Sequence, residues 1–169
     1  NLTGFLFRKQ AGLRPDSTLP VIKTDLQTLN LSEDLLVWFG HSSYLIQMEG
    51  KRLLVDPVFC TAAPVSFVNK PFKGTEVYRP EDMPDIDWAI LENGQYNEGW
   101  KYIHLMPGYM AAVARELKAA KILTVHHSKY ALATHPWDEP LKNARRMRDR
   151  DSLPVVIPQI GEVVNMAEY

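Results

Sequence analysis

Cysteine is nearly absent from this 169-residue chain, whose only example is Cys60. A single cysteine excludes an internal disulfide and a metal site built from cysteine pairs. It also fits a reducing compartment, so we expect a cytoplasmic location. The sequence begins with Asn1 rather than Met, which leaves open whether a signal segment precedes it.

Long apolar runs and an excess of one charge are absent as well. No run approaches the ~20 apolar residues of a membrane-spanning helix. The 19 basic and 20 acidic residues leave a net charge of −1. Such a balance argues against nucleic acid as a partner. The chain length favours a single domain, residues 1–169, that buries about 70% of its unfolded surface.

What remains is a pattern typical of an α/β fold. Pro107 suits a first helical position and is followed by apolar residues at helical spacing, which predicts a helix over 107–120. A second helix is predicted over 138–150. Apolar runs of strand length predict strands at 35–39, 43–48, 52–56, 86–91, 122–125, 154–158 and 162–165.

Histidines and carboxylates near the strand ends are the candidates for chemistry. His126 is either a core histidine bonded to the backbone or a metal ligand. His127 follows it, and adjacent residues of a strand point to opposite faces, so the two should not chelate one ion together. Asp56 either caps a loop or faces a cleft. His41, beside Gly40, is interpreted as a turn residue.

Two further groups have both a structural and a functional interpretation. His104, just before a predicted helix, is either a loop residue or part of a cleft. Glu92, Asn93 and Tyr96 could line the same cleft, although Asn-Gly is also an ordinary turn. The arginine cluster over 145–150 is interpreted as a solvated helix face rather than a phosphate site.

Five motifs occur in a recognisable order: WFGHSS (38–43), LVDPVF (54–59), LENGQYN (91–97), YIHLMP (102–107) and VHHSKYAL (125–132). Together they resemble hydrolases of the metallo-β-lactamase fold, in the branch of N-acylphosphatidylethanolamine phospholipase D-like and L-ascorbate-6-phosphate lactonase-like proteins. The resemblance covers roughly residues 18 to 140. It implies an αββα sandwich, two zinc ions, and a small-molecule or lipid-like phosphodiester or lactone substrate.

One motif of that family is missing. Its members carry His-x-His-x-Asp-His, which supplies most of the metal ligands, and this sequence has no such run. Residues 84–87 resemble the approach to that motif, whereas 88–93 resemble a strand much later in the family. The sequence therefore reads as if a middle segment were missing between Asp87 and Trp88, either through an internal deletion or because the sequence given omits it. Residues 1–87 then match the N-terminal part of the family, 88–169 match the C-terminal part, and the fold is an incomplete αββα sandwich.

The resemblance also implies a site. It assigns His126 as the last metal ligand, His104 and Tyr96 as catalytic residues, and Asp56, Glu92 and Asn93 to the substrate cleft. Because His126 alone matches a family ligand, we expect less than one zinc ion per chain.

Two functions follow. The first is a metal-dependent hydrolase that is inactive as this chain. The alternative is a non-catalytic remnant that acts through packing or self-association. Loss of the middle segment should also expose strand edges and apolar side chains that this segment would cover, which predicts a homo-oligomer. The residues concerned are Trp38, Phe39, Leu53, Leu54, Trp88 and Ile90.

Overall fold

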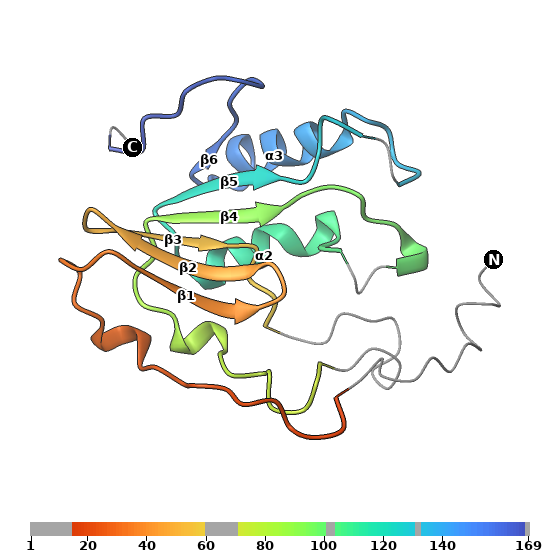
Figure 1. Ribbon diagram of the computed structural model, residues 1–169. Helices are drawn as coiled ribbons and strands as arrows, with labels where there is room; N and C mark the ends of the chain where they lie inside the picture. The colour runs from red at the N-terminus through yellow and green to blue at the C-terminus, as the bar shows by residue number, and fades with distance from the viewer. Residues whose placement is uncertain (1–14, 60–70, 101–103, 131–132, 168–169) are drawn as a thin grey trace.

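The computed structural model describes residues 15–59, 71–100, 104–130 and 133–167. They form one six-stranded sheet in the order β1-β2-β3-β4-β5-β6 (Figure 1). The strands are β1 Leu35–Gly40, β2 Ser43–Met48, β3 Lys51–Val55, β4 Trp88–Glu92, β5 Lys121–Val125 and β6 Val155–Val156.

The sheet changes character at β3. Strands β1, β2 and β3 are antiparallel neighbours, whereas β3 to β6 are parallel. Glu49 and Gly50 join β2 to β3 with φ angles of 50° and 71°. Positive φ at both loop residues is the geometry of a tight hairpin whose twist matches that of its strands.

Two helices make the connections between the parallel strands. Helix α2, Pro107–Leu117, links β4 to β5, and α3, Glu139–Asp149, links β5 to β6. Both lie on the same side of the sheet (Figure 1). This is expected when successive crossovers are right-handed and run in one direction across a sheet. Short 3₁₀ helices occupy Leu26–Thr28, Pro80–Asp82 and Glu98–Trp100.

The core lies between one face of the sheet and these helices. A row of cross-strand partners runs over that face from β2 to β6: Leu45, Leu54, Ala89, Ile122 and Val155. All are buried, and they share one cluster with the inward-facing residues of the helices, Met110, Ala114, Leu117, Ala144 and Met147. Parallel strands whose faces are covered by helices are typically apolar in this way.

The opposite face is apolar but less covered. Its cross-strand partners are Trp38, Tyr44, Val55, Ile90, Leu123 and Val156. Trp38 is 67% exposed and Leu36, on the same strand, is 60% exposed. Among the residues expected to lose their cover, Trp38 is open to solvent, whereas Leu54 and Trp88 are buried.

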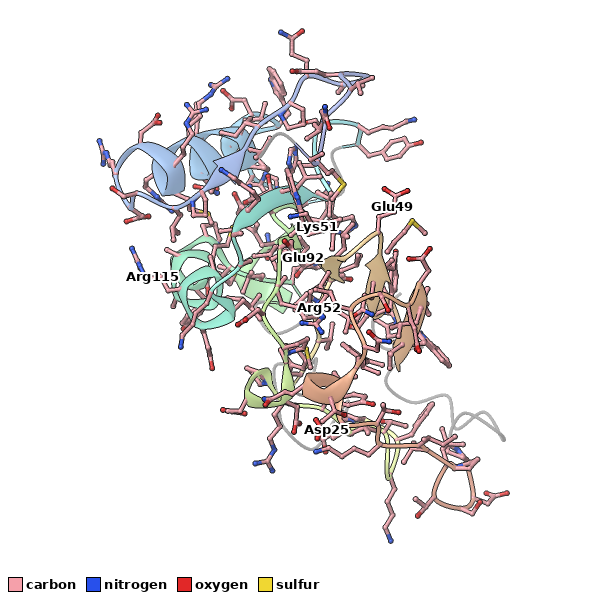
Figure 2. The ribbon with its side chains drawn as sticks, turned by 90° about the vertical axis from the view of Figure 1, so that its left-hand side faces the viewer. Asp25, Glu49, Lys51, Arg52, Glu92 and Arg115 are labelled. Carbon is pink, nitrogen blue, oxygen red and sulfur yellow. The ribbon has the colours of Figure 1, made fainter. Side chains whose placement is uncertain are left out.

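A polar network fixes the segment before β1 to the sheet. The buried amide of Gln47 donates to the carbonyl oxygens of Asn30 and Glu33, at 2.7 and 2.8 Å. Its oxygen accepts from Nε of Arg52 at 2.9 Å, and Arg52 also donates to the Leu29 carbonyl. The Arg52 side chain is labelled in Figure 2. Each polar atom of the Gln47 amide thus has a partner, as a buried amide requires.

The predicted fold class, α/β with an incomplete αββα sandwich, is confirmed. The antiparallel strands within 35–56 and both long helices are present, and the described residues contain a single sheet. The strand predicted at 162–165 is wrong. That stretch is irregular and mostly exposed, with Val163 at 91% exposure. Its side chains therefore have no buried face to pack against, and packing of that kind is what stabilises a strand.

At the predicted junction Asp87 directly precedes β4, which begins at Trp88. The Asp87 carboxylate accepts from the Arg52 amide at 2.9 Å, and its carbonyl accepts from the Lys121 amide at 2.8 Å. Lys51 adds an ion pair to the Asp87 carboxylate at 3.1 Å. Asp87 therefore anchors β4 between β3 and β5, which is the arrangement expected if two strands are fused. The deletion itself stays a prediction.

Candidate metal and catalytic site

Three ionisable side chains meet beyond the ends of two parallel strands. Glu92 is the last residue of β4, His126 follows β5, and His104 lies in the loop before α2. The carboxyl ends of parallel neighbours meet at one edge of a sheet, where open α/β folds bind their ligands. One ligand atom from each residue lies within 4.8 Å of the other two.

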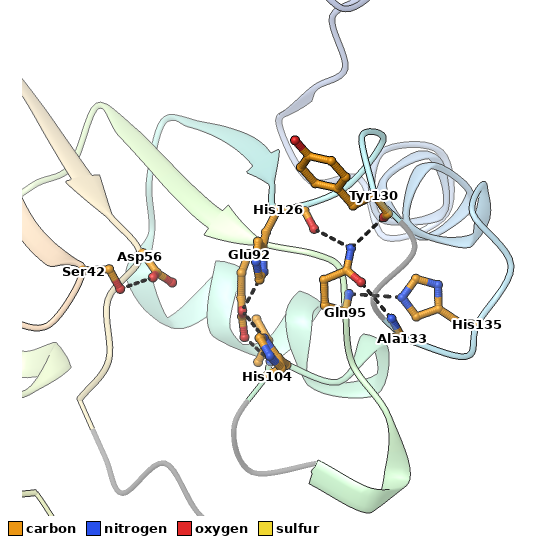
Figure 3. A network of polar contacts seen from close by, with 10 residues as sticks. Ser42, Asp56, Glu92, Gln95, His104, His126, Tyr130, Ala133 and His135 are labelled. Carbon is orange, nitrogen blue, oxygen red and sulfur yellow. Dashed lines mark hydrogen bonds and ion pairs between the residues drawn. The ribbon is translucent and has the colours of Figure 1, made fainter.

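The Glu92 carboxylate is the centre of this cluster. Its Oε2 lies 2.8 Å from Nδ1 of His104 and 3.6 Å from Nδ1 of His126 (Figure 3). Its Oε1 accepts a hydrogen bond from the backbone amide of Leu105. The two imidazole rings are 5.3 Å apart between centroids. Glu92 is thus fixed at one oxygen and presents the other to two histidines.

His126 is positioned by close backbone packing. It has a left-handed backbone, with φ of 67°. A Cβ added at Gly94 would come within 2.2 Å of its carbonyl oxygen. Only glycine allows the chain after β4 to approach so closely. Its side chain is 47% exposed, so the ring is accessible from solvent.

Gln95 holds the loop that follows His126. Its side-chain amide donates to the Tyr130 carbonyl at 3.1 Å, and its oxygen accepts from the Ala133 amide at 3.0 Å (Figure 3). Its own backbone amide donates to Nε2 of His135 at 3.1 Å. Only 6% of Gln95 is exposed. The sequence pattern did not point to Gln95, because a buried glutamine carries no signal that distinguishes it from a glutamine on the surface.

Asp56 lies just beyond β3, at the same edge of the sheet, but outside the three-residue cluster. Its carboxylate accepts from the Ser42 hydroxyl at 2.5 Å. The Ser43 hydroxyl donates to the Asp56 carbonyl, also at 2.5 Å, and accepts from the Val58 amide. These bonds tie the turn after β1 to the end of β3. The structure therefore supplies a loop-anchoring function for Asp56.

Tyr96 and Asn93 are directed toward α3. The Tyr96 hydroxyl donates to Glu139 at 2.8 Å and accepts from Asn143 at 2.7 Å, and its ring stacks on His135. Burial, followed by the contact with Glu139, raises the pKa of Tyr96. Asn93 is fully buried and donates to the Pro140 carbonyl at 2.7 Å. Both side chains join the loop after β4 to α3.

The remaining histidine and arginine candidates stand apart from the cluster. His127 contacts Thr124 and Ser128, while His126 faces Glu92, so the two diverge as expected. Burial lowers the pKa of His127. His41 is an exposed turn residue with φ of 51°. In α3, Arg148 pairs with Asp149 on an exposed surface.

The structure thus brings together three of the six predicted site residues, Glu92, His104 and His126. The sequence motifs gave them separate roles: Glu92 in the substrate cleft, His104 in catalysis and His126 as a metal ligand. One signal could have united two of them. Glu92 and His126 each follow directly on a predicted strand, and adjacent parallel strands place such residues at the same edge.

Comparisons with known proteins agree with the motif analysis at a coarse level. No family model matches the chain. The chain is 35% identical over 88 residues to N-acyl-phosphatidylethanolamine-hydrolyzing phospholipase D 1 of Caenorhabditis elegans, a match that spans 48% of this chain and 24% of that protein. It is 46% identical over 46 residues to outer membrane protein RomA of Klebsiella pneumoniae, across 27% of this chain and 35% of that one.

A solved structure is also similar. It is a putative Zn-dependent hydrolase of the metallo-β-lactamase superfamily from Thermotoga maritima, at 18% identity and a TM-score of 0.30, over 63% of this chain and 84% of that chain. The chain spans about a quarter to a third of the two curated relatives named above. In the described residues no helix is long and apolar enough to cross a membrane.

Proposed function

We propose that this chain is a metal-dependent hydrolase of the metallo-β-lactamase superfamily, acting on a phosphodiester or a lactone. The observation that carries the proposal is the meeting of Glu92, His104 and His126 beyond the ends of β4 and β5. The similarity to a phospholipase D over 88 residues supports the phosphodiester class. A lactone remains the second substrate class implied by the motifs.

The residues present fit one metal ion rather than two. Two catalytic zinc ions need about three protein ligands each. The chain lacks the His-x-His-x-Asp-His run, and the cluster in the described residues offers three ligand atoms. A bound divalent cation would supply Lewis acidity that polarises a phosphoryl or carbonyl oxygen. Two-ion chemistry does not fit this ligand set, and we expect the activity of the chain to be far below that of a two-ion enzyme.

The protein's own groups then have distinct roles. His126 is a metal ligand by resemblance. The resemblance implies that His104 stands beside the substrate as a proton donor. In the fold its Nδ1 faces Glu92 Oε2 at 2.8 Å, which also makes it a candidate ligand. The resemblance implies that Asp56 and Asn93 line the cleft, but Asp56 accepts from Ser42 and the fully buried Asn93 donates to Pro140, so we propose a structural role for both. Tyr96 acts by holding the loop, because its hydroxyl is engaged by Glu139 and Asn143.

The wider assignments belong to the same proposal. We place the chain in the phospholipase D-like and lactonase-like branch, with an internal deletion between Asp87 and Trp88. It forms one domain over residues 1–169 and binds a small-molecule or lipid-like substrate rather than nucleic acid. Its location is cytoplasmic, its metal is zinc, and its copies self-associate.

Hydrolysis of a chromogenic phosphodiester and of a simple lactone tests the proposal. The purified 169-residue chain is assayed with added zinc and again with a chelator. We expect chelator-sensitive turnover that falls at least about 100-fold in H126Q, since a metal-supported site loses its chemistry with its ligand. H41Q changes an exposed turn histidine and should retain wild-type rates.

The same assay separates the alternative function. Turnover at background for both substrates, from a folded chain in the presence of zinc, would contradict the hydrolase and favour the non-catalytic remnant. The exposed apolar face around Trp38 is the observation that favours that alternative.

A further inference from the structure

We infer that Glu92, His104 and His126 form a site for a single zinc-like ion, in which Glu92 is a metal ligand and His104 is a ligand rather than a proton donor. This inference rests on the proposed function, because it names the ion site of that same hydrolase. It differs from the ligand set implied by resemblance, in which only His126 takes part. Five histidines occur in the chain, and the fold selects two of them.

The donor set has the right chemistry. Two imidazoles and one carboxylate are a common ligand set of catalytic zinc, which keeps a fourth position open. Nitrogen and oxygen donors also suit cobalt, which makes that ion a usable spectroscopic probe. The side chains are partly exposed, at 18% for Glu92, 23% for His104 and 47% for His126. An ion can therefore reach the cluster, and an open position can face solvent.

The distances need little adjustment. Bonds of about 2.0–2.2 Å in tetrahedral geometry place ligand atoms about 3.3–3.6 Å apart. The separation between Glu92 Oε2 and His126 Nδ1, at 3.6 Å, already fits. The separation between Glu92 Oε2 and His104 Nδ1, at 2.8 Å, must widen by about 0.6 Å, which a small side-chain rotation provides.

The surroundings hold the ligands in place. The Leu105 amide fixes Glu92 through Oε1 and leaves Oε2 for the ion. Gly94 packs on the His126 carbonyl, and Gln95 bonds the loop that follows. Such supporting contacts orient ligands and raise metal affinity. The cluster is therefore a pre-arranged site built on two strand ends and the loop before α2.

Calorimetric titration of the metal-free, full-length chain with zinc tests the inference, with cobalt absorption as a second readout. We expect one ion per chain and a cobalt spectrum of tetrahedral type. E92Q keeps an oxygen for the Leu105 amide but removes the charge, so affinity should fall at least on the order of 10- to 100-fold. H104Q and H126Q should show a similar loss. H41Q and H127Q should bind as the wild type does.

Three results of the titration would overturn the inference. No binding, two ions per chain, or equal affinity in E92Q and the wild type would each contradict it. If E92Q fails to fold, H126Q decides the matter, because that side chain is half-exposed and makes no core contact on which the sheet depends. Zinc binding without hydrolysis would support the ion site but contradict the proposed function. Hydrolysis that continues in the presence of a chelator would support hydrolase activity but contradict the proposed ion site.

Discussion

Gly94 lies directly against the backbone of His126. A Cβ at Gly94 would come within 2.2 Å of the His126 carbonyl oxygen and 3.2 Å of the His127 Cβ. The loop after β4 and the loop after β5 therefore meet without space for a side chain. This contact sets the position of His126 relative to Glu92.

G94A should consequently weaken the site and the fold together. The methyl group must displace backbone rather than a flexible side chain, which costs about 1–3 kcal/mol. We expect a lower melting temperature and weaker zinc binding. G108A is the matched control, because a Cβ there meets nothing within 4 Å. Alanine within a helix should leave stability unchanged or raise it by up to about 1 kcal/mol. Equal effects of the two substitutions would contradict this account.

Gln95 should stabilise the loop after His126 more than any surface glutamine does. Q95L removes the bonds to Tyr130 and Ala133 and leaves their backbone groups without these partners. An unsatisfied buried group costs about 1–3 kcal/mol. We expect a lower free energy of unfolding and faster proteolysis within 126–135. Q159L, at an exposed position, is the control. Wild-type proteolysis of Q95L would show that the bonds do not hold the loop.

Tyr96 should make the free energy of unfolding decrease at high pH. Its pKa is raised in the folded chain, so the unfolded chain releases the proton first as pH rises above about 10. Stability from this group is complete below pH 10 and declines above it. Y96F should cost about 1–2 kcal/mol at pH 7 through the lost hydrogen bonds. That deficit should shrink between pH 10 and pH 11 in chemical unfolding. Y109F, at an exposed tyrosine, should show no such trend, and a constant deficit in Y96F would refute the linkage.

The apolar face of the sheet should drive self-association. Trp38 and Leu36 lie on the edge strand β1 and are 67% and 60% exposed. Edge strands and large apolar patches favour pairing between chains. Light scattering at micromolar concentration should find a dimer or larger species, and W38K should shift it toward the monomer. V163K changes an exposed position outside the sheet and should have no effect. A wild-type monomer with a cooperative melt would contradict this prediction.

Much of the fold could be predicted because its signals are local. Leu35–Gly40 and Pro107–Leu117 combine apolar spacing with turn or proline signals at their ends, and both form as expected. The predicted strand at 162–165 failed because strand formation depends on a buried partner face. That stretch has none in the described residues, and its Val163 is open to solvent. Apolar character alone does not report which neighbour a segment meets.

The site could be predicted only in part for a different reason. The motifs named Glu92, His104 and His126, but the ligand count used His126 alone. Glu92 and His104 are 12 residues apart in the sequence, and they meet through side-chain contacts: Glu92 Oε2 lies 2.8 Å from His104 Nδ1, and Glu92 Oε1 accepts from the Leu105 amide. Such contacts have no periodic signature in the sequence. The expectation of less than one zinc per chain therefore stays a prediction, now opposed by the three-ligand inference.

The most direct test is an anomalous difference map, recorded at the zinc absorption edge from crystals of the wild-type chain grown with zinc. We expect one strong peak, within about 2.0–2.2 Å of Glu92 Oε2 and of Nδ1 of His104 and His126. A peak bound by His127, His135 or His41, two peaks of equal height, or no peak would contradict it.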